Sequence, residues 1–202
     1  MPSDRLRLVI SGGGTAGHVY PALALLETWP RPRPEVTWIG TPEGMERDIV
    51  TDAGIPFVGV RAGAVRGQRP DLMVRSLTLV ALGVVEALWA LRRVRPDVVL
   101  TTGGSVSVPV AVAARLLRIP LVVFLPDVRP GVAVRAQQRF ATRIACAFDA
   151  AVEHLPADRT VVTGYPLRPG FSNGDRETAR KAFDAGLEPL LLLYGGSRGA
   201  RT

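Results

Sequence analysis

The chain of 202 residues has one cysteine and one lysine, and each scarcity excludes something. Because Cys146 is alone, the chain cannot form an internal disulfide or a cysteine-based metal cluster. Because Lys181 is the only lysine, arginine supplies nearly all of the positive charge, and its forked guanidinium binds phosphate in a bidentate way. The net charge of +7 favours anionic partners, namely phosphates, nucleic acid or an acidic membrane surface.

Long apolar runs are also missing. The apolar stretch Leu8–Ile10 near the N-terminus is too short for the core of a signal peptide. The longest apolar run, Leu77–Val85, falls well short of the roughly 20 residues that cross a bilayer. We therefore expect a soluble, cytoplasmic chain, for which contact with a membrane surface stays open. With 47% apolar residues it has enough material for a sizeable core.

Short apolar runs alternate with longer segments of helical character. The expected strands are Leu6–Ser11, Val36–Gly40, Phe57–Val60, Asp97–Thr102, Leu121–Leu125, Ala141–Ala145, Thr160–Thr163 and Leu190–Tyr194. The expected helices are Pro21–Thr28, Met45–Ala53, Leu72–Val94, Val108–Leu117, Val132–Phe140 and Arg176–Ala185. Several strands are apolar throughout, which is typical of burial on both faces of a parallel sheet. The alternation predicts an α/β fold with a doubly wound, Rossmann-like parallel sheet.

A break in this rhythm divides the chain. The stretch Gly164–Gly170 contains two prolines and two glycines, as linkers often do. After it come one expected helix, one expected strand and a glycine turn, too little for a domain. We therefore predict a first domain over residues 1–164, and a linker with the beginning of an incomplete second domain over residues 165–202.

Three glycine turns follow predicted strands. They are Ser11–His18, Gly103-Gly104-Ser105 and Gly195-Gly196-Ser197. Glycine lets the backbone approach a ligand closely, and the start of a following helix offers free N–H groups to an anion. Because the carboxyl ends of parallel strands meet at one edge of a sheet, these turns are candidates for a shared anion site.

The first turn also has the spacing of a dinucleotide site, through Gly12, Gly14 and Gly17. Such a site needs an acidic residue at the end of the second strand, whereas here Glu43 lies further on in the turn. A nicotinamide-dependent Rossmann enzyme stays open as an alternative. His18, beside the first turn, is well situated to act as a base.

The segment Gly13–Ala24 resembles the opening signature of the MurG family, the UDP-N-acetylglucosamine:N-acetylmuramyl-(pentapeptide) pyrophosphoryl-undecaprenol N-acetylglucosamine transferases. The likeness continues, in the order of the family, through Gly40–Glu46, Arg95–Val99, Gly164–Arg168 and Gly195–Arg201. The resemblance implies a GT-B fold, in which two Rossmann-like domains enclose the active site. The first domain would receive the lipid-linked acceptor, and the second would hold most of the UDP-sugar.

The resemblance also implies the reaction. N-acetylglucosamine would pass from UDP-N-acetylglucosamine to the C4 hydroxyl of lipid-linked N-acetylmuramyl-pentapeptide in peptidoglycan synthesis, with inversion and without a metal or cofactor. His18 matches the candidate base of the family. The positions that match donor-binding residues are Thr15, Ala16, Gly17, Asp127, Arg168 and Ser197. The glycine loops expected at the acceptor and diphosphate contain Gly13, Gly14, Gly103, Gly104, Ser105, Gly195 and Gly196.

Some positions depart from the family pattern. Ala16 replaces a usual glycine, and Ser105 stands where the family usually has an aromatic residue. Phe124–Asp127 replaces a His-Glu-Gln-Asn segment, so Asp127 takes the place of an asparagine. These changes bear on the acceptor more than on the reaction class. An acceptor-binding subunit of a split glycosyltransferase is the second alternative.

The predicted long helix over Asp71–Arg95 suggests a membrane contact. Projection at about 100° per residue puts one apolar face toward the sheet, made of Met73, Leu77, Val80, Val84, Leu88 and Leu91. The opposite face carries Leu79, Leu82 and Trp89 together with Arg75 and Arg93. We expect this face to contact the anionic inner leaflet of the cell membrane peripherally, although burial on both sides or a protein contact remains an alternative. No aromatic-interleaved basic stripe indicates nucleic acid.

Overall fold

A computed structural model describes residues 5–63, 70–168, 171, 174–186, 188–191 and 193, with residues 70–75 described by their backbone alone. The strands are β1 (Arg7–Gly12), β2 (Glu35–Gly40), β3 (Phe57–Gly59), β4 (Val98–Gly103), β5 (Leu121–Leu125), β6 (Arg143–Cys146) and β7 (Thr160–Val162). The helices are α1 (Ala16–Glu27), α2 (Glu46–Asp52), α3 (Pro70–Val94), α4 (Ser107–Leu116), α5 (Val132–Gln137) and α7 (Arg176–Ala182), with short 3₁₀ helices η1 (Asp149–His154) and η2 (Ala157–Arg159).

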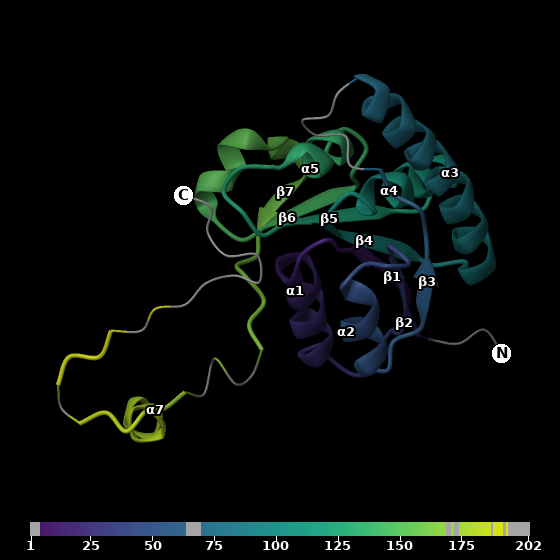
Figure 1. Ribbon diagram of the computed structural model, residues 1–202. Helices are drawn as coiled ribbons and strands as arrows, with labels where there is room; N and C mark the ends of the chain where they lie inside the picture. The colour runs from purple at the N-terminus through teal and green to yellow at the C-terminus, as the bar shows by residue number, and fades with distance from the viewer. Residues whose placement is uncertain are drawn as a thin grey trace.

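The seven strands form one parallel sheet in the order β3-β2-β1-β4-β5-β6-β7. The chain winds outward from β1 to β3 and then returns to β4 and winds in the opposite direction. Because parallel crossovers are right-handed, this reversal puts α1 and α2 on one face and α3, α4 and α5 on the other (Figure 1). The predicted doubly wound sheet is confirmed. Its reversal point, between β1 and β4, is where such folds bind ligands.

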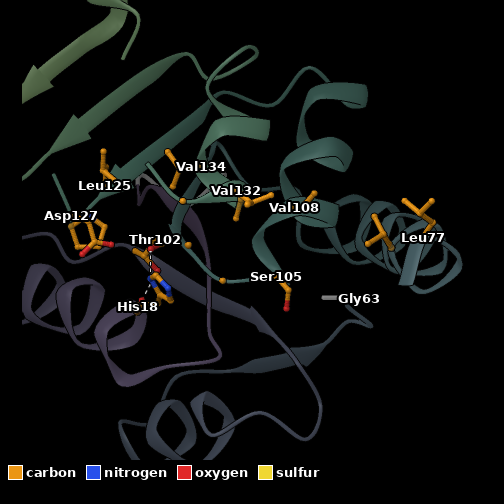
Figure 2. A pocket seen from close by; sticks show the side chains of 16 residues that line it. His18, Gly63, Leu77, Thr102, Ser105, Val108, Leu125, Asp127, Val132 and Val134 are labelled. Carbon is orange, nitrogen blue, oxygen red and sulfur yellow. Dashed lines mark hydrogen bonds between the residues drawn. The ribbon is translucent and has the colours of Figure 1, made fainter. Parts of the chain in front are cut away.

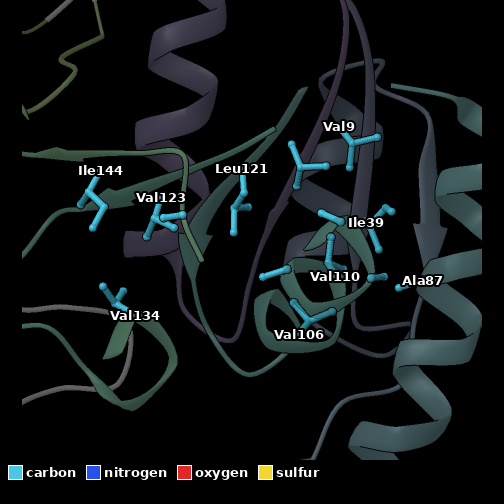
Figure 3. Packing of buried hydrophobic residues seen from close by; sticks show 14 of the residues in the cluster. Val9, Ile39, Ala87, Val106, Val110, Leu121, Val123, Val134 and Ile144 are labelled. Atoms are coloured by element: carbon cyan, nitrogen blue, oxygen red, sulfur yellow. The ribbon is translucent and has the colours of Figure 1, made fainter. Parts of the chain in front are cut away.

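The strands are apolar throughout because both faces of the sheet are covered. Val9 and Ile10 are neighbours in β1, point to opposite faces and are both fully buried. Val9 packs with Ala87 of α3 and Val110 of α4 (Figure 3). Ile10 belongs to the core on the side of α1 and α2. Burial on both faces, as expected from the sequence, is therefore the observed packing.

The buried side of α3 matches the predicted one only in part: Leu91 is fully buried as expected, and Leu82 and Trp89 of the opposite face are exposed as expected. Leu77, expected to face the sheet, is 54% exposed, whereas Leu79, expected to face water, is half-buried. The seam that packs inward consists of Ser76, Gly83, Ala87, Ala90 and Leu91. An added Cβ on Gly83 would collide with the carbonyl oxygen of Arg61, so the helix approaches its neighbours closely through small residues. A projection that weighs only apolar character overlooks such a seam.

Two other segments depart from the predictions. Helix α1 begins at Ala16, five residues before the expected start, and contains Pro21 in its second turn. The expected strand over 190–194 is wrong for its described residues, since Leu190, Leu191 and Leu193 lie in no strand. All three are exposed, and in the described part of the chain no neighbouring strand pairs with them.

The last helix, α7, lies apart from the sheet (Figure 1). Across the described residues, no helix combines the length and the apolar character needed to cross a membrane.

Candidate functional site

The first two glycine loops meet where β1 and β4 end. Gly104 lies so close to the backbone of Gly13 that an added Cβ would collide with the Gly13 carbonyl oxygen. Gly103 and Gly104 both have positive φ angles, 111° and 84°, which an L side chain rarely adopts. Glycine is therefore required in the second loop both for its conformation and for the approach of the first loop.

His18, in the first turn of α1, lies against this second loop. Its Nδ1 is 2.8 Å from the backbone oxygen of Thr102, and an added Cβ on Gly103 would lie 2.7 Å from the imidazole. The Thr102 hydroxyl donates in turn to the backbone oxygen of His18. Because a carbonyl oxygen only accepts, Nδ1 must carry the proton, and a neutral ring then has its lone pair on Nε2. This tautomer suits a base that accepts a proton through Nε2.

A pocket of about 450 Å³ opens beside His18. The polar side chains that line it are those of His18, Thr102, Ser105 and Asp127 (Figure 2). The rest of its wall is largely apolar and is formed by Leu77, Val80, Val108, Leu125, Pro126, Val132, Ala133 and Val134, with Gly63 and Gly131. Asp127 and Leu77 lie at opposite ends of the group drawn in Figure 2. The pocket therefore offers a polar region next to the imidazole and a larger apolar region toward α3.

A buried polar chain holds the second loop from behind. The Thr101 hydroxyl donates to Oε1 of Gln137 at 2.6 Å, and Nε2 of Gln137 donates to the Ser107 hydroxyl at 2.8 Å. Ser107 donates to the backbone oxygen of Gly104 at 2.7 Å. Thr101, Ser107 and Gln137 are all fully buried. These hydrogen bonds were not predicted from the sequence, where their only signal is Gln137 within the apolar periodicity of α5.

The structure brings some of the predicted site residues into one pocket. His18, Gly103, Gly104, Ser105 and Asp127 all line it. The first loop and the start of α1 adjoin it without forming its wall, which applies to Gly13, Gly14, Thr15, Ala16 and Gly17. Gly195, Gly196 and Ser197 lie outside the described residues, as does the side chain of Arg75.

Arg168 lies away from the pocket wall, against the outer surface of α1. Its guanidinium is 4.7 Å from the centre of the Tyr20 ring and 5.7 Å from that of Phe171. Nearby, Tyr165 makes an edge contact with Phe124 at the end of β5. Burial raises the pKa of the Tyr165 phenol, and the negative charge of Asp127 raises it further, so the phenol stays protonated at neutral pH. These contacts hold residues 165–168 against α1 and the end of β5.

Comparison with known proteins agrees with the resemblance seen in the sequence. The chain is 40% identical over 200 residues to a UDP-N-acetylglucosamine--N-acetylmuramyl-(pentapeptide) pyrophosphoryl-undecaprenol N-acetylglucosamine transferase of Symbiobacterium thermophilum, an alignment that covers 97% of this chain and 54% of the relative. It is 40% identical to the protein of the same name in Desulforudis audaxviator, over 98% of this chain and 54% of that protein. The chain thus spans about half the length of these curated relatives.

Solved structures share the fold. The crystal structure of Acinetobacter baumannii MurG is similar with a TM-score of 0.69 and 27% identity, over 83% of this chain and 48% of that one. A UDP-GlcNAc 2-epimerase from Methanocaldococcus jannaschii, at 13% identity and a TM-score of 0.55, covers 80% of this chain and 45% of its own; that likeness concerns the fold alone. The GT-B class expected from the sequence is confirmed for the N-terminal domain.

The family model of the glycosyltransferase family 28 N-terminal domain matches residues 8–146, from the second residue of β1 to the last residue of β6. This range includes both described glycine loops, His18 and the whole pocket wall. Since the match extends over more than half of the residues, the chain belongs to the glycosyltransferase family 28 N-terminal domain family.

Proposed function

We propose that the chain is the acceptor-binding part of an inverting glycosyltransferase. It would transfer N-acetylglucosamine from UDP-N-acetylglucosamine to the C4 hydroxyl of a lipid-linked N-acetylmuramyl-pentapeptide. The observation that carries the proposal is the imidazole of His18, which is held by the Thr102 carbonyl at the edge of a pocket that the second glycine loop lines. The names of the curated relatives supply the substrate class.

In this reaction Nε2 of His18 takes the proton of the acceptor hydroxyl while its oxygen attacks the anomeric carbon of the donor sugar. The new bond joins that carbon to the acceptor oxygen, and the bond to the diphosphate breaks, so UDP leaves with the electron pair. Backbone N–H groups and arginine would stabilise the charge that develops on the diphosphate. The apolar wall of the pocket suits the hydrocarbon part of a lipid-linked acceptor.

The proposed binding roles follow the predicted domains. Residues 1–164 would bind the acceptor, and residues 165–202 would form the linker and the beginning of a donor-binding domain. The residues proposed to contact the donor are Thr15, Ala16, Gly17, Asp127, Arg168 and Ser197. The loops proposed at the acceptor and the diphosphate contain Gly13, Gly14, Gly103, Gly104, Ser105, Gly195 and Gly196. Of the two described loops, the second is the one proposed to contact the diphosphate.

A transfer assay tests the proposal. Labelled N-acetylglucosamine is offered to a lipid-linked muramyl acceptor in the presence of this chain, and separately of this chain extended by a donor-binding domain. We expect transfer by the extended form. Acceptor binding without transfer in either form would instead identify a subunit of a split enzyme. Tight binding of NAD, measured by calorimetry beside UDP-N-acetylglucosamine, would refute the proposal.

One observation argues against the nicotinamide alternative. The acidic side chain that approaches the end of β2 is Glu46, which is fully buried. Its carboxylate accepts hydrogen bonds from the backbone N–H groups of Gly14 and Thr41. It is therefore unavailable to the ribose hydroxyls that such an acidic residue holds in dinucleotide sites.

Arg168 is proposed to contact the donor diphosphate from the linker. In the extended form, Arg168→Ala should raise the KM for UDP-N-acetylglucosamine about 10- to 100-fold, the range expected when a hydrogen bond to a charged group is lost. The KM for the acceptor should stay unchanged. Arg115→Ala is the matched control, since Arg115 is an exposed arginine in the last turn of α4 and lies outside the pocket wall. Equal effects on the two substrates would contradict the assignment.

The exposed side of α3 is proposed to contact an anionic membrane at the inner face of the cell membrane. Leu82 and Trp89 are 41% and 66% exposed, and the guanidinium of Arg93 lies 5.6 Å from the centre of the Trp89 ring. Leu79, part of the face predicted from the sequence, contributes less because it is half-buried. Leu77, exposed on the same helix, also lines the pocket, so the proposed membrane surface adjoins the proposed acceptor site.

Vesicle binding checks this surface. Replacing Leu82 and Trp89 together by serine should weaken binding to vesicles that contain anionic lipid by about tenfold or more, because two apolar side chains lose their burial in the interface. Val161→Ser is the control. Val161 is an exposed apolar residue of β7, an edge strand separated by two strands from β4, which follows α3 in the chain. Unchanged binding of the double variant, with the control also unchanged, would rule out the surface.

A further inference from the structure

A buried carboxylate lies under the first glycine loop, and the reaction described above does not use it. Glu46 is the first residue of α2, and its side chain is fully buried. Its Oε2 accepts the N–H of Gly14 at 3.1 Å, and its Oε1 accepts the N–H of Thr41 at 2.8 Å. Within the described part of the chain it forms no ion pair. Two backbone N–H groups are therefore the partners that the structure gives this carboxylate.

The loops around Glu46 are shaped to the carboxylate. An added Cβ on Gly13 or on Gly44 would collide with it, and one on Gly40 would lie 3.0 Å from its Cγ. Three glycines, in the first loop, at the end of β2 and in the turn after it, therefore leave room for one carboxylate. Because a buried carboxylate is costly unless it is hydrogen-bonded, these contacts indicate a specific role rather than a tolerated side chain.

The contact changes what the first loop offers to a ligand. The N–H of Gly14 already has a partner, and a phosphate placed over Gly13 and Gly14 would meet the negative charge of Glu46. The expectation that this N–H contributes to an anion cradle is therefore not supported. The first loop instead holds His18 and the second glycine loop in place. The backbone oxygen of Thr15 accepts the backbone N–H of His18 at 3.1 Å, and Gly13 packs against Gly104.

We propose that Glu46 is a positioning residue for His18 and for the second glycine loop. Its carboxylate ties the first loop to the turn at Thr41, withholds the Gly14 N–H from the diphosphate, and leaves the diphosphate to the second loop. The reaction that this arrangement serves rests on the proposed function. The arrangement itself does not, because its contacts join only residues of the chain.

Amide exchange followed by NMR on the 202-residue chain tests the arrangement. In the ligand-free chain the amides of Gly14 and Thr41 should exchange slowly, since both are already hydrogen-bonded. In Glu46→Gln one acceptor oxygen remains while the new NH₂ group faces the other N–H. One of the two amides should then exchange at least about tenfold faster, with the core amides of Val9 and Leu100 still protected. The matched control is Asp48→Asn, because Asp48 is an exposed carboxylate on the same helix. It should change the exchange rate of neither amide.

A spectroscopic signature separates positioning from mere packing. The ring nitrogen signals of His18 should report one tautomer in the native chain, with the proton on Nδ1, and a mixture or exchange broadening in Glu46→Gln. In the extended form, Glu46→Gln should lower kcat about tenfold, as expected for a misplaced base.

The outcomes are distinct. Scalar couplings across the hydrogen bonds, from the amide nitrogens of Gly14 and Thr41 to the carboxyl carbon of Glu46, need no variant and decide the matter even where Glu46→Gln does not fold. Absent couplings, or native exchange rates and a single His18 tautomer in a folded Glu46→Gln, would overturn the proposal. A lack of glycosyl transfer by the native extended form would refute the proposed function and leave the amide results standing.

Discussion

Replacing His18 by alanine should lower kcat by about 10² or more in the form of the chain that transfers the sugar, as expected for a lost general base. The imidazole is held by the Thr102 carbonyl, which assigns the proton to Nδ1 and leaves Nε2 to accept the hydroxyl proton. The backbone oxygen of residue 18, which accepts the Thr102 hydroxyl, is kept by the substitution. The loss should therefore appear in kcat rather than in folding, and initial-rate measurements at saturating substrates check it.

His154→Ala provides the control for this prediction, because His154 is exposed, closes η1 and lies outside the wall of the pocket. Its kcat should remain at the native value. A decrease below threefold in His18→Ala would mean that His18 only shapes the loop, in which case the base belongs to another residue. The proposed reaction could then survive, but the role of the imidazole in it would not.

Gly104→Ala should destabilise the chain by about 2–4 kcal/mol, the largest stability effect that we expect from a single added methyl group. Two costs combine. The φ angle of 84° disfavours an L residue, and the new Cβ would collide with the backbone of Gly13, whose carbonyl carbon would be 3.0 Å away. Both contacting groups belong to the backbone and are held by buried contacts, so moving either loop to relieve the collision costs free energy. Chemical denaturation followed by circular dichroism measures the free energy of unfolding.

Gly17→Ala is the matched comparison for Gly104→Ala. Gly17 lies in the first turn of α1, and the nearest atom to an added Cβ is the Thr15 hydroxyl at 3.8 Å. Since alanine favours helix over glycine by up to about 1 kcal/mol, this variant should be neutral or slightly more stable. If the two variants had the same stability, the close approach of the two loops would not be a property of the molecule in solution.

Much of the fold was predictable because its signals are local. Alternation of apolar runs with helical segments placed the seven strands of the described sheet within about two residues, and glycine turns directly after β1 and β4 marked the edge of the sheet where the pocket lies. His18 could be selected because it directly follows such a turn. The wrong expectation at 190–194 has the same origin, since an apolar run looks like a strand whether or not a partner strand lies beside it.

The face of α3 shows where local reasoning ends. Periodicity ranks residues by apolar character, and so it assigned Leu77 to the core. The packing instead selects Ser76, Gly83 and Ala87, because small side chains let the helix come close to its neighbours. Which stripe of a helix is buried depends on the shape of what it meets, and that shape is formed by segments distant in the sequence.

By itself, the sequence determined the parallel α/β architecture, the glycine loops at the strand ends and the histidine beside them. All three arise from neighbours in the chain, through side-chain pattern and backbone freedom. Only the tertiary structure decided that Glu46 binds Gly14, 32 positions away, and that Gln137 binds Thr101, 36 positions away. A buried polar side chain acquires its role from the groups that folding brings to it, and for Glu46 those groups are the amides of Gly14 and Thr41.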